Sequence, residues 1–115
     1  MRVSILSGTE LDWAVTVIEN PDALKYGLED WKQRRKYGVK NGEFLFRWSS
    51  SWAQGGPIIQ REGISINYEN GQWIATRAEG AAVSEQWGTS PLDAAMRCYV
   101  AAMLGDDIEI PKEWQ

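Results

Sequence analysis

The chain has 115 residues, a formal net charge of −4 at pH 7, no histidine and one cysteine. Its length suits one domain, residues 1–115, that can bury a core without metals or disulfides. A lone cysteine excludes an intrachain disulfide, and the missing histidine excludes Ser–His and Cys–His nucleophile pairs and imidazole metal ligands. For catalysis this leaves carboxylates, a lysine nucleophile or an all-oxygen Mg²⁺ or Ca²⁺ site.

No segment of the sequence resembles a secretory signal or a membrane span. The stretch Val3–Leu6 is too short for the hydrophobic region of a signal peptide. No run approaches the roughly 20 apolar residues of a membrane helix. The best candidate, Ala94–Leu104, is interrupted by Arg97. With one cysteine, the sequence predicts a soluble protein of a reducing compartment.

The first elements predicted are a short strand over residues 2–6 and a helix after it. Ser7 with Glu10, and Thr9 with Asp12, have the spacing of a capping box. Four apolar residues then follow with helical spacing and form one stripe: Leu11, Ala14, Val15 and Ile18. The helix should end at Asn20, because a residue before proline avoids helical backbone angles.

Residues 22–40 favour a short amphipathic helix, with Leu24, Leu28 and Trp31 on one face and its end at Tyr37-Gly38. Asn41-Gly42 is a turn signal. A strand is expected over 43–48, with its aromatic side chains on one face.

The segment Trp52–Ile64 reads WAQGGPIIQREGI and is the most distinctive in the chain. Its adjacent glycines, its proline and the short apolar run after them indicate a loop with an unusual backbone path that leads into a strand. We therefore predict a loop here, followed by a strand.

A β-hairpin is predicted next. Residues 64–68 and 73–76 alternate between apolar and polar, and Asn70-Gly71 between them favours the primed turn of an antiparallel pair. Residues 77–85 are small and polar and are expected to form a loop.

The last helix has the clearest start signal. Ser90 can cap it, Pro91 suits its first turn, Asp93 completes the capping box, and Gly105 is placed to end it. Residues 108–110 suggest a short final strand. The predicted fold class is α+β: a small antiparallel sheet packed with two main helices, to which the segment 22–40 adds a short third.

Each side chain that might carry chemistry also has a structural interpretation. The acids at 10 and 12 suit the positive end of a helix dipole, and those at 106, 107 and 109 suit solvent beyond a helix end. Cys98 lies inside a helix, where a buried structural thiol is favoured over a reactive one. Gly55-Gly56 could let a backbone approach an anion, but it lacks the lysine and hydroxyl of a phosphate-binding loop, so a tight turn is favoured.

The arginines have the same two interpretations. Arg61 can orient an anion or pair with Glu62 at the surface. Arg97 interrupts an alanine-rich helix and can either bind a ligand or extend a buried stem to solvent. Between residues 32 and 40 five basic residues occur without an intervening acid, and aromatic residues lie near them. Proteins that bind single-stranded nucleic acid use this combination of charge and aromatic rings, although a solvated helix face is favoured here. The five residues are Lys32, Arg34, Arg35, Lys36 and Lys40.

Several motifs together resemble a known family. They are Leu11–Val15, Trp52–Ile59, Arg61–Ile64, Trp73 with Ala75, Pro91-Leu92, Ala94–Val100, Leu104–Asp106 and Pro111. Over about two-thirds of its length the chain is similar to the NinX-type family of small bacteriophage and prophage proteins. The segment 21–41 has no counterpart among these motifs, and Ser51 stands where the family often has an acid. The resemblance implies a phage-encoded accessory protein in the cytoplasm of the infected bacterial host, and it implies no particular activity.

Three functions from different classes follow. The first is a non-catalytic binding module that acts on a host or phage protein, including against host defences, by analogy with other small phage proteins. The second is binding of a nucleotide or similar small anion at the Trp52–Arg61 loop. The third is an enzyme that uses carboxylates and a divalent metal. We expect the first, with no catalytic residue, metal or cofactor, no membrane contact and no nucleic-acid partner; the oligomeric state stays open.

For either kind of binding the candidate residues are the same. Trp52 would stack on the ligand, Gly55 and Gly56 would give access to the backbone, and Arg61 or Arg97 would hold charge. Gln54 completes the set.

Overall fold

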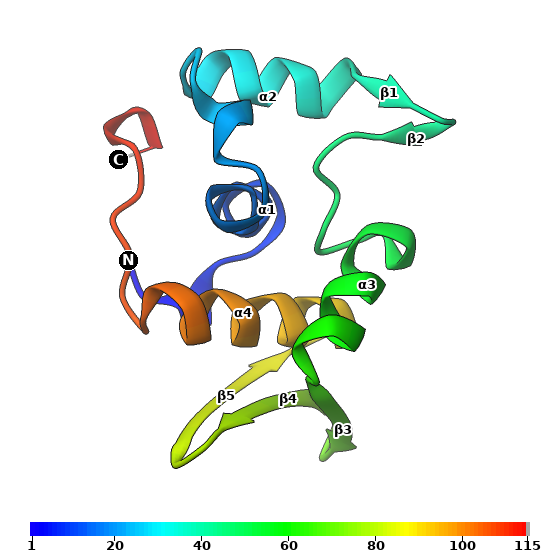
Figure 1. The fold of residues 1–115 in the computed structure, drawn as a ribbon, viewed down its shortest axis with the longest axis vertical. Helices are drawn as coiled ribbons and strands as arrows, with labels where there is room; N and C mark the ends of the chain where they lie inside the picture. The colour runs from blue at the N-terminus through cyan, green and yellow to red at the C-terminus, as the bar shows by residue number, and fades with distance from the viewer. Residues whose placement is uncertain (115) are drawn as a thin grey trace.

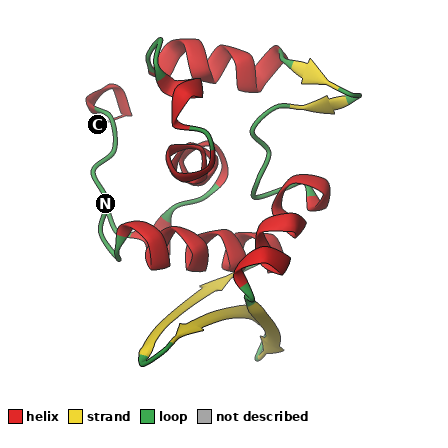
Figure 2. Ribbon diagram, in the orientation of Figure 1, coloured by secondary structure: helices red, strands yellow, loops and turns green. Residues whose placement is uncertain are grey.

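A computed structural model describes residues 1–114 and gives an α+β fold, as predicted. The described part has four α-helices and two antiparallel sheets (Figure 2). The helices are α1 (Gly8–Glu19), α2 (Leu28–Tyr37), α3 (Trp52–Glu62) and α4 (Pro91–Leu104). The strands are β1 (Val39–Lys40), β2 (Glu43–Phe44), β3 (Ser65–Glu69), β4 (Gln72–Glu79) and β5 (Ala82–Gly88). Short 3₁₀ turns lie at Val3–Ile5, Pro21–Leu24 and Lys112–Trp114.

Helix α4 lies between the two main layers of the molecule. In Figure 1 the three-stranded sheet lies on one side of α4, and α1, seen end-on, lies on the other. Its predicted start is confirmed, because the Ser90 hydroxyl accepts a hydrogen bond from the backbone N–H of Asp93 at 3.1 Å. Its predicted end is confirmed at Gly105, which has a φ of 95°. Eight of its fourteen residues are buried, so it is a core helix rather than a surface helix.

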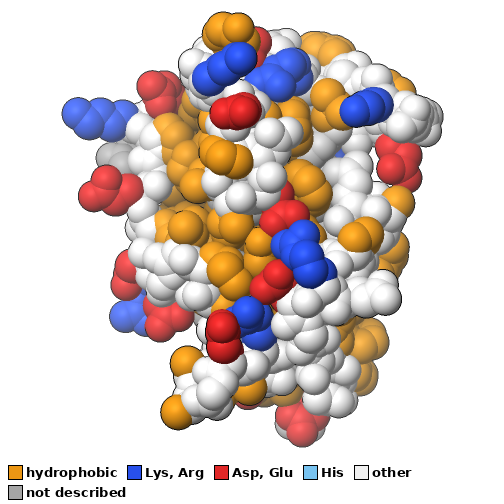
Figure 3. Space-filling model, in the orientation of Figure 1, with side chains coloured by type: hydrophobic (Ala, Val, Ile, Leu, Met, Phe, Trp, Pro, Cys, Tyr) orange, Lys and Arg blue, Asp and Glu red, His pale blue; other side chains and the backbone are white. Residues whose placement is uncertain are grey.

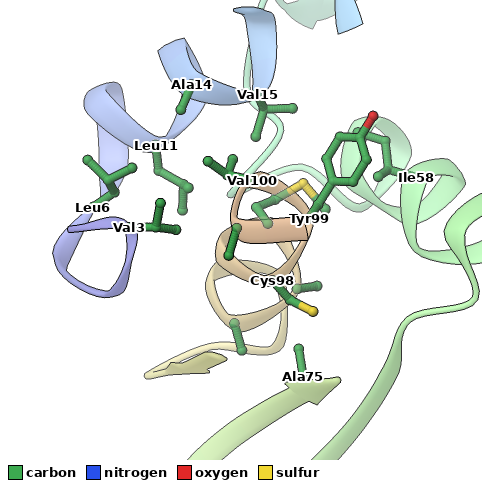
Figure 4. Packing of buried hydrophobic residues seen from close by; sticks show 14 of the residues in the cluster. Val3, Leu6, Leu11, Ala14, Val15, Ile58, Ala75, Cys98, Tyr99 and Val100 are labelled. Atoms are coloured by element: carbon green, nitrogen blue, oxygen red, sulfur yellow. The ribbon is translucent and has the colours of Figure 1, made fainter. Parts of the chain in front are cut away.

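The core surrounds α4 on three sides. Figure 4 shows Leu11 and Val15 of α1 facing Val100, Tyr99 lying towards Ile58 of α3, and Cys98 pointing at Ala75 of the sheet. Burying apolar surface in this way is the main source of stability for a domain of this size. A smaller cluster lies around α2, where the rings of Trp31 and Phe46 stack with centroids 5.7 Å apart.

The three-stranded sheet has the order β3-β4-β5 and extends further than predicted. The Asn70-Gly71 turn is confirmed, with Glu69 paired to Gln72. The loop predicted over residues 77–85 is wrong, because β4 continues to Glu79 and β5 pairs with it after a second two-residue turn. The strand was missed because its less exposed face carries Ser84, Gln86 and Gly88, which are polar or small and form no apolar stripe. Pairing with β4 forms the strand without such a stripe.

The β1–β2 hairpin confirms the Asn41-Gly42 turn but not the full strand after it. The strand predicted over residues 43–48 ends at Phe44. Phe46 has a φ of 58°, which breaks the extended backbone and turns its ring into the cluster around α2. Of the aromatics predicted to share one face, Phe46 is buried and Phe44 is exposed, so their alternation indicated neither a common environment nor the strand length.

The segment Trp52–Ile64 is the main correction: it is helix α3 and not a loop leading into a strand. Gly63, in the left-handed region, ends the helix, and Ile64 bonds back to the Ile59 carbonyl at 3.1 Å. Pro57 loses one hydrogen bond within the helix, a cost that the packing of Gly55 and Ile58 offsets. A Cβ on Gly55 would lie 2.7 Å from Leu92 Cδ2 and closer still to the Trp48 carbonyl oxygen. That glycine therefore permits close packing rather than a turn.

The strands predicted near the two chain ends are also wrong. Residues 3–5 form a 3₁₀ turn, and residues 108–110 form no strand. The two segments meet instead through a single antiparallel bridge between Arg2 and Asp107, supported by the bond from Val3 N–H to the Asp106 carbonyl at 2.8 Å. Within residues 1–114, no helix is long and apolar enough to cross a bilayer.

The two adjacent glycines of α3 should respond oppositely to alanine. Gly55→Ala should lower the free energy of unfolding by about 1–3 kcal/mol, because its methyl group would overlap the Trp48 carbonyl and Leu92. Gly56→Ala, the matched control, should be neutral or stabilising by up to about 1 kcal/mol, because alanine is the better helix former. Its methyl group would meet only the edge of Trp52, at 3.9 Å. Urea unfolding followed by circular dichroism measures both; equal stabilisation would contradict this packing.

Candidate functional site

A buried ion pair between Asp12 of α1 and Arg35 of α2 anchors the centre of the molecule. Asp12 is 0% exposed, and its Oδ2 accepts bonds from Arg35 Nε at 3.0 Å and Nη2 at 2.7 Å. Its Oδ1 accepts the backbone N–H of Ser49 at 2.8 Å. Burial raises the pKa of Asp12, against the lowering by Arg35 and Ser49. One carboxylate thus joins α1, α2 and the segment before α3.

The segment 47–49 is held to the same helices by further polar contacts. Arg47 donates to the Arg35 carbonyl at 2.8 Å, and the indole N–H of Trp48 donates to the Thr16 hydroxyl at 3.0 Å. Thr16 in turn donates to the Asp12 carbonyl at 2.8 Å. Burial and the neighbouring Arg35 lower the pKa of Arg47. These bonds fix the backbone from which α3 begins.

A cavity of about 470 Å³ opens beside this network, where three helices begin. We call it the Trp52 pocket. Its lining comes from the first residue of α1, the segment before α3, the start of α4 and one side chain of α2. The lining residues are Gly8, Arg35, Ser49, Ser50, Trp52, Ser90, Pro91, Leu92 and Asp93.

The chemistry of the Trp52 pocket is that of hydrogen-bond donors beside an aromatic ring. Helix N-termini carry partial positive charge and free N–H groups. Neither α1 nor α3 has a side-chain cap on these groups. Trp52 is 56% exposed, so its ring is free to stack. Arg35 adds a cation that Asp12 neutralises, and Asp93 adds an anion. The pocket therefore suits a small ligand whose acceptor atoms can meet these N–H groups.

The structure brings only one of the predicted site residues, Trp52, into this pocket. Gln54 is a structural link: its Nε2 donates to the Phe44 carbonyl at 2.7 Å, and its Oε1 accepts the Arg47 N–H at 2.6 Å. Gly55 is buried in packing, and Gly56 lies on the open side of the helix near the Trp52 ring.

Arg61 lies on a different surface from Trp52. It forms a two-pronged pair with Glu19, at 3.0 and 2.8 Å, and also bonds Glu62 and the Tyr99 hydroxyl. Burial disfavours the charge on Glu19, but the bonds from Arg61 and Tyr99 outweigh burial and lower its pKa. Hydrogen bonds to Glu19 and Glu62 raise the pKa of Arg61. Arg61 thus joins α1, α3 and α4.

Arg97 is also occupied within the fold. Its Nε donates to the Leu6 carbonyl and its Nη1 to the Trp87 carbonyl, both at 2.7 Å. It lines a shallow cavity of about 220 Å³ with residues of the sheet, away from the Trp52 pocket. The single concavity formed by Trp52, Arg61 and Arg97 that the second hypothesis requires does not exist in the structure.

The basic segment is largely neutralised by ion pairs. Lys32 pairs with Glu29 and Arg34 with Asp30 on the surface of α2, while Arg35 pairs with the buried Asp12. On the face that Figure 3 shows, basic and acidic side chains are interspersed rather than separated into a basic patch. This arrangement favours the helix-face interpretation over contact with nucleic-acid backbone.

The remaining reactive groups are dispersed. Cys98 is fully buried, and burial raises its pKa to about 11, so its thiol is not activated. Among residues 1–114, no three acids or thiols are grouped so that they could hold a metal ion.

The sequence did not identify Arg35, Ser49, Ser50 and Ser90 as lining one pocket. Sequence reasoning places Arg35 in a solvated basic face and Ser90 at a helix cap, and it gives Ser49 and Ser50 no role. No local signal joins the starts of α1, α3 and α4, and the segment that begins α3 was itself predicted as a loop. Only the fold brings those starts together.

Removing the Asp12 carboxylate should destabilise the protein strongly. Asp12→Ala leaves the Arg35 guanidinium and the Ser49 N–H without a partner, and we expect a loss of about 3 kcal/mol in the free energy of unfolding. Asp30→Ala, the matched control, breaks the half-exposed pair with Arg34 and should cost less than about 1 kcal/mol. Urea titration compares the two; equal losses would show that the buried pair is not an anchor.

Comparison with known proteins agrees with the motifs of the sequence. No curated protein matches the chain. The family described as bacteriophage P22, NinX, matches residues 2–103, a range that runs through the segment 21–41 for which the motifs had no counterpart. That range also contains the Asp12–Arg35 pair and every residue that lines the Trp52 pocket. The chain therefore belongs to the NinX family of bacteriophage P22.

Proposed function

We propose that this phage accessory protein is a non-catalytic binding module that acts on a host or phage protein in the cytoplasm of the infected bacterium. The observation that carries the proposal is an apolar surface on the β1–β2 hairpin. Val39 is 57% exposed and Phe44 is 52% exposed, and the two residues are cross-strand partners, so their side chains share one face. We call this pair the hairpin surface. Exposed aromatic and aliphatic side chains on a fixed support are typical of protein contact sites.

The hairpin surface contacts the rest of the fold through Phe44, although its strands have only two residues each. A hairpin this short is unstable by itself. Here the Phe44 carbonyl accepts a bond from Gln54 of α3, and the Arg47 guanidinium lies 5.2 Å from the centre of the Phe44 ring. Gln54 therefore has a supporting role in this proposal. A surface fixed before binding loses less entropy when a partner docks.

The residues available for chemistry favour contact over turnover. The chain has no histidine, its thiol is buried, and Arg61 and Arg97 are engaged by their own fold. The carboxylate and metal hypothesis gains no support from the described residues, which form no metal-binding group. Action against host defences is one use of such a module, by analogy with other small phage proteins.

Replacing the hairpin surface with serines should abolish capture of the partner. Val39→Ser with Phe44→Ser removes two exposed apolar side chains, and surface changes of this kind should alter stability by no more than about 0.5 kcal/mol each. The matched control is Ile5→Ser with Tyr68→Ser, which are similarly exposed elsewhere. Cross-linking of tagged protein in infected cells, quantified by mass spectrometry, should recover one set of proteins with wild type and control only. Unchanged recovery by the hairpin variant, or no recovery by wild type in several hosts, would contradict the proposal.

A second candidate function is binding of a small anionic ligand such as a nucleotide in the Trp52 pocket. Three helix starts, two of them uncapped, surround an exposed tryptophan there, and helix N-termini favour anions. The roles first assigned to Arg61 and Arg97 are not retained, because both lie outside this pocket.

A nucleotide that binds in the Trp52 pocket should quench tryptophan fluorescence and raise the melting temperature, by an amount that grows with the logarithm of its concentration above the Kd. The test uses a panel of nucleotides with inorganic phosphate as reference. Trp52→Phe should remove most of the quenching, whereas Trp73→Phe, the matched control in the sheet, should retain it. Absence of any response across the panel would eliminate this function.

A further inference from the structure

Strand β5 is a free edge of the three-stranded sheet. In residues 1–114 it pairs only with β4, and its seven residues keep one register without a bulge. Figure 1 shows β5 as the outer strand, below α4. Natural edge strands are usually protected by a bulge, a proline or a lysine, and β5 has none of these.

The register shows which backbone groups of β5 are free. The two-residue turn at Gly80-Ala81 makes Glu79 and Ala82 a hydrogen-bonded pair, and such pairs alternate along an antiparallel ladder. Val83, Glu85 and Trp87 therefore direct their N–H and C=O groups away from β4. Arg97 donates a hydrogen bond to the Trp87 carbonyl, as expected if that carbonyl points away from β4.

The free edge lines a cleft of about 580 Å³. Four consecutive residues of β5, 83–86, form one side of it. The other side comes from Arg2 and Ser4 and from the segment that follows α4, residues 105–107, with Ala101 of α4 also contributing. A cleft bounded by a strand edge on one side has the shape used when an extended peptide adds to a sheet.

The charges around this cleft favour a basic occupant. Glu85, Asp106 and Asp107 line it, against the single cation of Arg2. The carboxyl end of α4 also points here, with no basic residue in its last turn to balance the negative end of the helix dipole. Because Glu85 directs its backbone N–H and C=O away from β4, it would form a hydrogen-bonded pair with the residue opposite it on an added strand, and the two side chains would lie on one face of the sheet.

We propose that β5 accepts an extended, lysine- or arginine-bearing segment of a partner protein as an additional strand of the sheet. Backbone bonds to Val83 and Glu85 supply the pairing, and the acids of the cleft select basic side chains. A second copy of the chain is a poor occupant, because antiparallel pairing of two β5 strands about their centre places Glu85 opposite Glu85. The inference shares with the proposed function the premise of protein contact, but it concerns a different surface, and its test leaves the hairpin surface unchanged.

The probe is a capped peptide of sequence TKVKVKT, compared with TEVEVET and with a version that has proline at the central lysine. Fluorescence anisotropy should show TKVKVKT binding at least about tenfold more tightly than TEVEVET, and binding should weaken as salt rises. The proline peptide, which lacks the central N–H, should bind more weakly than its parent. Amide exchange by NMR should slow at Val83 and Glu85.

The matched variants separate a charge effect at the cleft from a general one. Glu85→Gln with Asp106→Asn and Asp107→Asn should weaken binding of TKVKVKT by about tenfold or more, whereas Asp22→Asn with Glu69→Gln and Glu113→Gln should not. Equal binding of the two charged peptides, or NMR shifts that map away from β5, would overturn the proposal. So would protection of Val83 and Glu85 that rises with protein concentration alone, because the edge would then serve self-association. The peptide comparisons on wild-type protein decide the matter even if a variant does not fold.

Discussion

The carboxylate of Asp12 is the buried charge to which the upper half of the molecule is attached. It comes from α1, yet its bonds reach Arg35 of α2 and the backbone of Ser49, two segments 23 and 37 residues away. A charge that is fully removed from water is tolerated only when such bonds compensate its lost hydration. The hairpin, the start of α3 and the wall of the Trp52 pocket all depend on where this pair holds α2 and residues 47–49.

Local chemical signals predicted the elements whose ends they mark. Ser90, Pro91 and Gly105 delimit α4, and the two Asn-Gly sequences mark the turns of the β1–β2 and β3–β4 pairs, of which only the second was predicted as a hairpin. These signals act over a few residues, so they survive whatever packs around them. The prediction of a loop over residues 52–64 was wrong because the structure of that segment depends on distant contacts. Glycine and proline normally disfavour a helix, and only the contact of Gly55 with Trp48 and Leu92 explains them inside one. Nothing within the segment itself encodes that contact.

The candidate site was less predictable than the fold. Trp52 was identified because a tryptophan close to two adjacent glycines is distinctive in a sequence. Arg35 was not, because its partner Asp12 and the pocket it lines are formed by segments distant in the chain. Arg61 and Arg97 were given ligand roles that their own neighbours, Glu19 and two backbone carbonyls, already fill. A sequence shows which side chains can bind an anion, but not which ones the fold has already engaged.

Helix α4 has a consequence for how the protein can vary. Its residues face α1, α3 and the sheet in turn, as Val100, Tyr99 and Cys98 do (Figure 4). Ala94, Ala95 and Ala101 are buried in the same helix, so added side-chain volume there would push apart the layers that pack on it. The two proposed contact surfaces lie in different layers, the hairpin beyond α1 and the β5 edge below α4. Sequence drift can therefore remodel either surface independently, while positions 94, 95 and 101 of the helix between them are confined to small residues.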